Sequence, residues 1–171
     1  MDFLDLAHER YSVRKFQSRS IEQEKLEAIL EAGRVAPTAM NIQPQKVYII
    51  KSAEGLEKIN KISPCIYGAP VVLMVAYDKN IVFHNVSDNN ITSGEQDTSI
   101  VGTHMMLAAW SLGIGSCWVN RFSPAEVKKA FDLPESEQVV FLMPIGYADQ
   151  DAIPSERHCT KKSLEDLCVE L

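Results

Sequence analysis

A continuous apolar run over residues 71–77, Val-Val-Leu-Met-Val-Ala-Tyr, constrains the fold of this chain more than any other feature. Ala69-Pro70 lies directly before it. A strand with one face in water alternates apolar and polar residues, and this run does not alternate. We therefore expect a central strand that is covered on both sides.

Three other segments have the composition of strands. Residues 46–51 centre on Val-Tyr-Ile-Ile, whose β-branched and aromatic side chains favour a buried strand. Residues 139–146 form a further apolar strand. Gly113-Ile-Gly115 predicts a helix C-cap followed by a short strand over 116–119, and the lack of a third glycine excludes a dinucleotide-binding fingerprint there.

Five helices are predicted from periodicity and start signals. They cover residues 2–9, 20–35, 53–62, 97–112 and 123–131. Ser20-Ile-Glu-Gln and Ser123-Pro-Ala-Glu are capping boxes, in which the serine hydroxyl accepts a hydrogen bond from the first turn. The polar and basic tail from Ile153 is expected to add an edge strand or to hook over a neighbouring molecule.

The helix predicted over 97–112 has apolar residues around more than half of its circumference, which is typical of a buried core helix. On this interpretation His104 is a core histidine. Cys117 lies between Ser116 and Trp118 on a predicted strand, so we interpret it as a small core residue and not as a nucleophile. The four cysteines are scattered and lack zinc-ligand spacing, which predicts free thiols and no metal site.

Size and charge limit the class of protein. The chain has 171 residues, of which 46% are hydrophobic, so we expect a single domain over 1–171. No run approaches the ~18 apolar residues of a membrane span, and the acidic N-terminus lacks the regions of a signal peptide. These features predict a soluble cytoplasmic protein. A net charge of −6 argues against nucleic acid or an anionic membrane as the main partner.

A local basic cluster stands out against this acidic background. Arg10, Arg14, Lys15 and Arg19 lie within ten residues, with the hydroxyl of Ser12 among them. Arginine offers a planar fork of donors to phosphate oxygens, and a serine hydroxyl can complete the cradle. The segment therefore suits a small, dense anion such as a phosphate, although a solvated basic turn has the same composition.

A second polar patch follows the helix predicted over 20–35. Residues 36–44 read Ala-Pro-Thr-Ala-Met-Asn-Ile-Gln-Pro, where Pro37 stops the helix and Pro44 keeps the preceding residue extended. The amides of Asn41 and Gln43 each carry donors and an acceptor. This loop has the properties of a binding surface for a flat molecule, and its bland alternative is a plain helix-to-strand connection.

No hydrolase elbow, zinc-protease helix or Walker loop is present, so hydrolase and nucleotide-triphosphatase functions have no support. Three polar patches remain, over residues 10–14, 38–43 and 161–162. A ligand with a phosphate at one end, a polyol in the middle and a flat, hydrogen-bonding ring at the other would use all of them. Flavin mononucleotide (FMN) is such a ligand.

The motifs resemble those of the FMN-dependent nitroreductase superfamily. The match includes Arg10-x-Ser12-x-Arg14, the 36–44 loop, Ala69-Pro70 before a buried strand, Asp97 at the head of the long helix, and Pro144-Ile-Gly146-Tyr. The resemblance covers essentially the whole chain. It implies an α+β three-layer sandwich, with a mostly antiparallel central sheet flanked by helices, assembled as an intimate homodimer with FMN at the interface.

The resemblance also implies which residues bind FMN. Arg10 and Ser12 would lie at the phosphate and ribityl chain, Arg14 would reach the pyrimidine edge of the ring, and Tyr11 between them would also belong to the cofactor site. The loop would reach the flavin of the other subunit through Pro37, Thr38, Ala39, Met40 and Asn41. The basic tail would close on the phosphate through Lys161 and Lys162. The backbone at Asn120 and Arg121 would face flavin N5.

Two positions depart from the family pattern. Arg121 stands at a turn where relatives often have glycine, and Gln45 stands where an aromatic residue, often tryptophan, is common. The first departure bears on the contact with N5. The segment over 78–94 is expected to differ from larger members as a surface excursion near the active site.

The activity implied is an FMN-dependent NAD(P)H oxidoreductase. NADH or NADPH would give hydride to flavin N5, and a nitroaromatic, quinone or related small acceptor would then take the electrons in a ping-pong cycle. A flavin reductase, or an enone or dehalogenating reductase of the same fold, is the alternative enzyme. A non-catalytic FMN-binding or redox-sensing module and a plain interaction domain are alternatives from other classes.

Overall fold

The computed structural model describes residues 2–88 and 90–171. Its centre is a sheet in the order β1-β2-β4-β3, in which every neighbouring pair is antiparallel. The strands are β1 (Gln45–Ile50), β2 (Val71–Asp78), β4 (Glu137–Gly146) and the short β3 (Gly115–Ser116). The strand predicted over 116–119 therefore shrinks to β3 and an isolated bridge between Val119 and Leu142.

The strand β2 confirms the prediction of a central strand covered on both faces. Its side chains alternate between two separate apolar clusters, one on each side of the sheet. The first cluster receives Val72, Met74 and Ala76, and the second receives Val71, Leu73 and Val75. All six side chains are buried, so neither face of this strand meets water.

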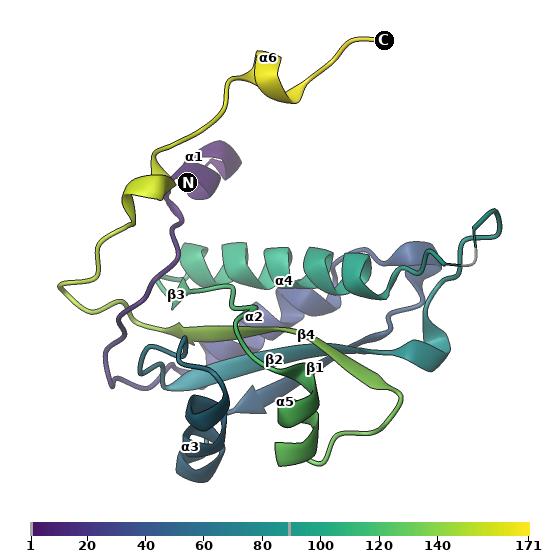
Figure 1. The fold of residues 1–171 in the computed structure, drawn as a ribbon. Helices are drawn as coiled ribbons and strands as arrows, with labels where there is room; N and C mark the ends of the chain where they lie inside the picture. Colours follow the sequence, from purple (N-terminus) through teal and green to yellow (C-terminus); the bar gives the residue numbers. More distant parts are fainter. Residues whose placement is uncertain (1, 89) are drawn as a thin grey trace.

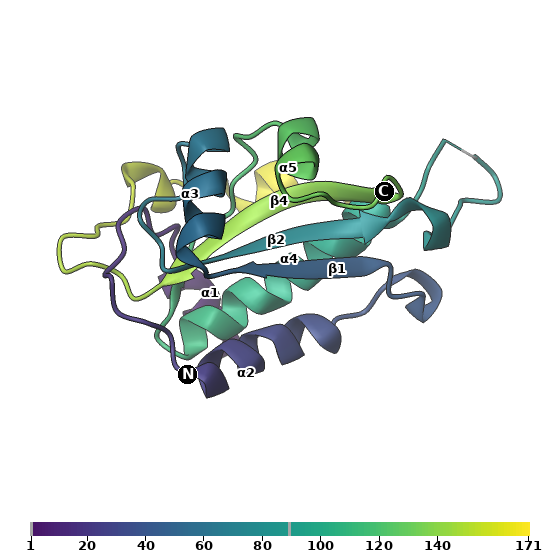
Figure 2. The same cartoon turned by 90° about the horizontal axis from the view of Figure 1, so that it is seen from below.

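Two pairs of helices cover the two faces of the sheet. The helices α2 (Gln23–Arg34) and α4 (Gly94–Ser111) lie on one face, while α3 (Ala53–Ile62) and α5 (Pro124–Ala130) lie on the other (Figures 1 and 2). The helix α4 approaches the sheet closely because Gly102 has no side chain. A Cβ atom at that position would lie 2.4 Å from the Phe141 ring. The expected α+β three-layer sandwich with an antiparallel sheet is confirmed.

The start of α2 differs from the capping-box prediction. The helix begins at Gln23 and its N-cap is Glu22, with no side-chain cap. The Glu22 carboxylate instead accepts hydrogen bonds from the Tyr147 hydroxyl, at 2.5 Å, and from Arg19, at 2.6 Å. Tertiary contacts therefore override the local capping pattern at Ser20. At Ser123 the capping prediction holds, since its hydroxyl accepts from the Glu126 N–H at 3.3 Å.

The long helix α4 is buried on one side only. Val101 and Met105 are buried in the apolar cluster that α4 shares with α2 and the sheet, and Gly113, with φ of +74°, closes the helix as predicted. The prediction that His104 is a core residue is wrong. Its side chain is exposed, its Nδ1 lies 2.9 Å from the Ile100 carbonyl oxygen, and Ile100 is itself 38% exposed. The apolar residues predicted from periodicity cover more of the α4 surface than the sheet and α2 bury, so His104 and Ile100 remain outside the core.

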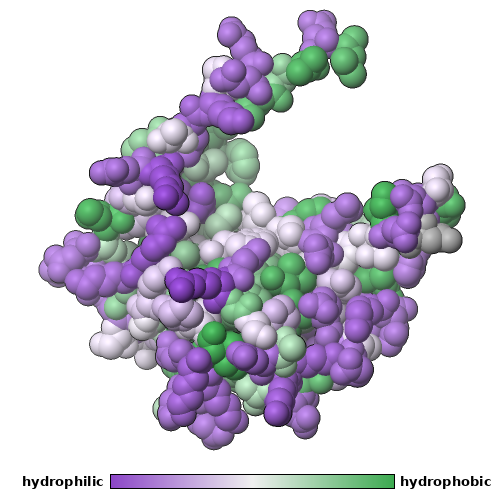
Figure 3. Space-filling model, in the orientation of Figure 1, coloured by the Kyte–Doolittle hydropathy of each residue, from purple (hydrophilic) through white to green (hydrophobic). Residues whose placement is uncertain are grey.

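The remaining elements are short. They are α1 (Phe3–Glu9), α6 (Leu164–Leu167) and the 3₁₀ turns η1 (Ala39–Asn41), η2 (Lys79–Ile81) and η3 (Glu156–His158). The C-terminal tail stands off the body and leaves Leu164, Leu167, Val169 and Leu171 uncovered (Figures 1 and 3). Within the described part of the chain the tail forms no strand, so the edge-strand alternative is wrong.

None of the helices in residues 2–88 and 90–171 is both long and apolar enough to cross a bilayer.

Candidate functional site

The segment after α1 runs beside β3 and presents its polar residues outward. Ser12 pairs with Ser116 in a parallel bridge, and the Val13 N–H donates to the Ser116 carbonyl at 2.9 Å. Val13 is completely buried, and Gly115 is needed beneath it, because a Cβ there would lie 2.6 Å from the Val13 side chain. With Val13 anchored inward, its neighbours Ser12 and Arg14 are directed away from the core.

The chain after β4 returns to this segment. The Tyr11 hydroxyl donates to the Ala152 carbonyl at 3.1 Å, and Lys15 pairs with Asp149 at 3.1 Å and with Asp151 at 2.9 Å. Tyr11 also packs edge-on against Trp110, with 5.1 Å between ring centroids. These contacts bring the beginning of the C-terminal tail beside the N-terminal basic segment.

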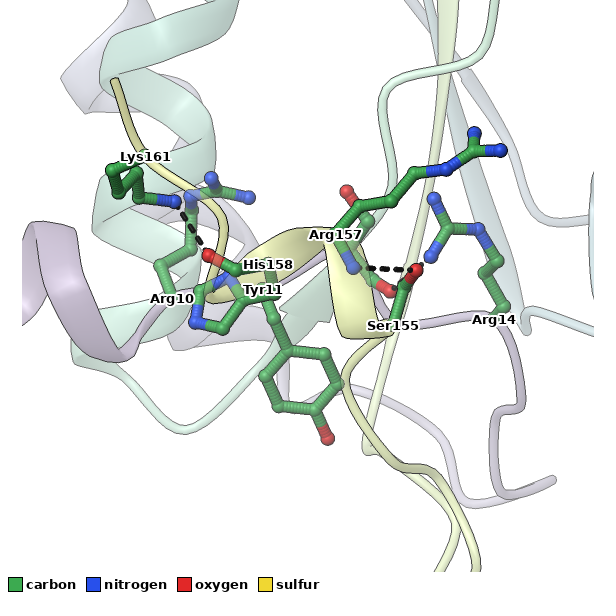
Figure 4. Close-up of a pocket in the computed structure, with 8 residues that line it drawn as sticks. Arg10, Tyr11, Arg14, Ser155, Arg157, His158 and Lys161 are labelled. Atoms are coloured by element: carbon green, nitrogen blue, oxygen red, sulfur yellow. Dashed lines mark hydrogen bonds between the residues drawn. The ribbon is translucent and has the colours of Figure 1, made fainter.

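A pocket of about 520 Å³ lies between the two segments (Figure 4). It is lined by Arg10, Tyr11, Ser12, Arg14, Ser155, Arg157, His158 and Lys161. Figure 4 shows the Arg14 and Arg157 side chains on one side of the pocket, and Arg10 and Lys161 on the other. Lys161 is oriented by a 2.6 Å hydrogen bond to the His158 carbonyl.

The pocket is strongly electropositive. Four of its lining side chains are cations, and no carboxylate lines it. None of those four cations forms an ion pair with any residue that the structure describes. Unpaired cations held together repel each other and are stabilised by an anion, especially by phosphate, which arginine binds with two parallel hydrogen bonds. The arrangement therefore fits an anionic, phosphate-bearing ligand.

Cys117 lies behind this pocket and is 3% exposed, which confirms the prediction of a core residue. Burial raises the pKa of the Cys117 thiol, while the Arg14 charge and a hydrogen bond from Ser12 act in the opposite direction. The adjacent Ser116 hydroxyl is buried and has no partner among the described residues. All four cysteines are free thiols, as expected.

The loop over residues 38–43 is held in an unusual shape. Met40, Asn41 and Gln43 have φ between 50° and 57°, in the left-handed region. Asp97 is 2% exposed, and its Oδ1 accepts from the Ala39 N–H at 2.8 Å, while its Oδ2 has no partner among the residues described. The loop therefore keeps its shape through a buried carboxylate on α4.

The turn at Asn120 and Arg121 follows directly from the strand segment that begins at β3. The Trp118 indole N–H donates to Asn120 Oδ1 at 2.7 Å, and the Phe122 N–H donates to the Asn120 carbonyl at 3.1 Å. Within the described residues, neither the Asn120 nor the Arg121 backbone N–H has an acceptor. Two backbone donors at this turn are thus free for a ligand.

The residues singled out from the sequence fall into three places. Arg10, Tyr11, Ser12, Arg14 and Lys161 line the basic pocket together, whereas Lys162 does not line it. The turn at 120–121 lies further along the strand that Ser12 joins. Pro37, Thr38, Ala39, Met40 and Asn41 lie at the opposite end of the sheet in both views (Figures 1 and 2).

Sequence reasoning missed three residues of the pocket, namely Ser155, Arg157 and His158. Arg157 belongs to the tail that composition had already identified as basic, so the sequence did offer a reason to consider it. Ser155 and His158 carried none, because their place depends on the contacts of Lys15 and Tyr11 with a segment about 140 positions away.

Comparison with known proteins agrees with this architecture. The model of the nitroreductase family matches residues 7–65 and 61–147. A nitroreductase family protein from Clostridium difficile 630 is 39% identical, with a TM-score of 0.92 over 99% of this chain and 98% of that one. A protein of Methanothermobacter thermautotrophicus, assigned as an NADH dehydrogenase/NAD(P)H nitroreductase, is 31% identical over 86% of this chain and 78% of its own length.

A third similarity concerns the fold alone. A nitroreductase-fold protein from Exiguobacterium sibiricum, solved in complex with FMN, is 20% identical with a TM-score of 0.83 over 100% of this chain and 98% of that one. The family model spans most of the chain, including the basic segment, the 38–43 loop and the turn at Asn120. On these grounds the chain belongs to the nitroreductase family.

Proposed function

We propose that this chain is an FMN-dependent NAD(P)H oxidoreductase. The observation that carries the proposal is the basic pocket, which gathers four cations without a carboxylate in a chain of net charge −6. A phosphate monoester is the flavin group that such a pocket fits. The FMN held by the Exiguobacterium sibiricum protein and the NAD(P)H in the name of the Methanothermobacter relative support the same assignment.

We assign the phosphate end of the ligand to the basic pocket. Arg10 and Ser12 would hold the phosphate and the start of the ribityl chain, and the tail would close on them through Arg157 and Lys161. Arg14 would reach the pyrimidine edge of the ring. A fixed cation there favours the negative charge that reduction places near N1 and the C2 carbonyl.

The reacting end of the ligand is assigned to the turn at Asn120 and Arg121. Its two free backbone N–H groups are suitable donors to N5. Bound FMN would supply the redox chemistry, taking hydride from NADH or NADPH at N5 and passing two electrons to a nitroaromatic, quinone or related acceptor in a ping-pong cycle. The protein would bind, orient and shield, so no side chain is required as a general acid or base.

We further propose that two copies of the whole chain, each acting as one FMN-binding domain over 1–171, form a homodimer. The 38–43 loop and the basic pocket lie at opposite ends of the sheet, so one copy does not bring both to one ligand (Figures 1 and 2). Met40 at the loop tip is 81% exposed, and Val35 and Ile100 nearby are also uncovered. A second copy would cover these apolar groups and place its loop against the flavin.

An absorbance spectrum of the purified protein, recorded without oxygen before and after addition of NADH or NADPH, tests the proposal. We expect a yellow protein with a flavin spectrum that bleaches on addition of the nicotinamide. Flavin that does not bleach would instead favour an FMN-binding or redox-sensing module. Protein that stays colourless after incubation with FMN would refute the cofactor assignment.

A further inference from the structure

A buried serine outside the pocket reaches the turn at Arg121. Ser63 follows α3 directly, is 0% exposed, and closes that helix by donating its backbone N–H to the Ile59 carbonyl at 2.9 Å. Its hydroxyl donates to the Arg121 carbonyl at 2.9 Å and accepts from the Cys65 N–H at 3.3 Å. The hydroxyl therefore links the segment before β2 to the turn, across 58 positions of sequence.

The hydrogen bonds of the turn fix the direction of its backbone. No peptide bond in the described residues is cis, and in a trans peptide the C=O and N–H point in opposite directions. With its carbonyl held by Ser63, the Arg121–Phe122 peptide directs the Phe122 N–H onto the Asn120 carbonyl, at 3.1 Å. That bond in turn holds the Asn120–Arg121 peptide, whose own N–H must point the other way.

We propose that Ser63 is a positioning residue that aims the Arg121 backbone N–H at the hydride-accepting nitrogen of the bound flavin. The inference rests on the proposed function, since it takes the turn at Arg121 to face N5. Arg121 supplies no glycine-like freedom at this position, so the orientation of its peptide depends on the partners of the two carbonyls. Ser63 holds the Arg121 carbonyl. It thereby also fixes the direction of the Asn120 carbonyl, which accepts from the Phe122 N–H.

The hydroxyl has a specific effect on the reaction. Bound FMN would accept hydride at N5, and a backbone N–H that donates to N5 would polarise the ring toward accepting it. An alanine at position 63 would leave both the Arg121 carbonyl and the Cys65 N–H without their partner. The carbonyl lies in a partly buried position, so once it loses this donor we expect it to turn toward another donor or toward water, and the peptide to rotate away from the direction that serves N5.

The competing explanation is that Ser63 merely ends α3 and supports the fold. Ser52 provides a matched control, because it caps the other end of the same helix, where its hydroxyl accepts from the Gly55 N–H at 3.1 Å. Ser52→Ala removes one serine hydroxyl and one helix-terminal hydrogen bond, and among the described residues the Ser52 hydroxyl bonds only to the Gly55 N–H. Both alanine variants should lower the melting temperature. Only Ser63→Ala should change the rate of flavin reduction and the N5 resonance.

The test uses full-length protein loaded with FMN, mixed rapidly with NADH or NADPH without oxygen. For Ser63→Ala we expect the limiting rate of flavin reduction to fall about tenfold, the scale of changes to groups that orient a reacting centre, with an unchanged dissociation constant for the nicotinamide. Ser63→Thr, which retains the hydroxyl, should recover most of the rate. Ser52→Ala should reduce at the wild-type rate.

A second readout does not depend on turnover. In protein loaded with nitrogen-15-labelled FMN, the N5 resonance reports hydrogen bonding to that atom, and Ser63→Ala should move it downfield. Unchanged rate and resonance in a folded Ser63→Ala variant would overturn the positioning role, and so would an equal loss of rate in Ser52→Ala. If the wild-type protein bound no FMN, the proposed function itself would fail. That result differs from the two outcomes that would overturn only the role of Ser63.

Discussion

The two regions that we assign to the flavin are built in contrasting ways. The basic pocket joins the N-terminal segment to the C-terminal tail and is defined by four unpaired cations. The 38–43 loop carries no charged side chain, and its shape is fixed by left-handed backbone and by buried Asp97. In the proposed site, the first region would recognise charge and the second would recognise shape. Because they lie at opposite ends of the sheet, each can be disabled while the other stays intact.

The largest effect is expected from the charged region. Replacing both Arg10 and Arg14 by alanine should weaken FMN binding by about 100-fold or more, because each hydrogen bond to a charged group contributes about 1.5–3 kcal/mol. Titration of FMN fluorescence at low and high salt measures this, and the salt dependence of binding should be weaker in the variant, because two of the four pocket cations remain. Arg34→Ala is the control, since Arg34 is already paired with Glu31 at 2.6 Å. Wild-type affinity in the double variant would remove the basic pocket from the flavin site.

A smaller effect is expected from the loop. Asp97→Ala removes the acceptor of the Ala39 N–H, which should destabilise the chain by about 1–3 kcal/mol and weaken FMN binding roughly tenfold. Asp97→Asn keeps an acceptor oxygen and should retain most of the affinity. Urea unfolding and FMN titration measure the two consequences separately. A loop variant that loses stability but binds FMN normally would confine the loop to a structural role.

Mixing the two kinds of variant sharpens the comparison further. The Arg10/Arg14 variant and the Asp97→Ala variant, unfolded together and refolded as an equal mixture, should form mixed dimers in which one site combines two intact regions. Random pairing in a two-fold dimer predicts recovery of about a quarter of the wild-type flavin sites. No recovery beyond the sum of the separate variants would argue that both regions act within one subunit.

The smallest effect concerns the strand β1, which follows the loop, at high pH. Burial, followed by a hydrogen bond to Glu137, raises the pKa of Tyr48 to about 12 from the model-peptide value of 10.0. The folded chain thus holds this proton more tightly than the unfolded chain, so the stabilisation is complete below pH 10 and is lost as pH rises toward 12. Tyr48→Phe should flatten the fall in melting temperature across this window. If the melting temperature of Tyr48→Phe fell as steeply as that of the wild type, another titrating group would be responsible for the fall.

Much of the fold follows from local patterns, and the exceptions have identifiable causes. The run over 71–77 and the helix over 53–62 were predictable because their side chains mostly meet the nearest layer of the sandwich. His104 was not, because periodicity finds an apolar stripe without saying what covers it. The capping pattern at Ser20 failed because Glu22 is committed to Tyr147, a partner 125 positions away.

The site was predictable to the extent that it is written in short motifs. Arg10-x-Ser12-x-Arg14 marked the pocket residues of the N-terminal segment, but the pocket residues of the tail depend on how the tail folds back. That return is set by long-range pairs such as Lys15 with Asp149. The link between Ser63 and Arg121 has no motif at all, since it joins a helix end to a distant turn through one hydroxyl.

The left-handed backbone of Met40, Asn41 and Gln43 has a consequence for selectivity. Each such non-glycine residue costs roughly 1 kcal/mol, and this cost is met when the chain folds and not when a ligand arrives. In the proposed site, the loop would therefore present to the flavin a shape that is set before the ligand binds. Planar molecules of similar size and charge would be separated by small differences in thickness and outline, because poor fit at this surface is not relieved by local movement.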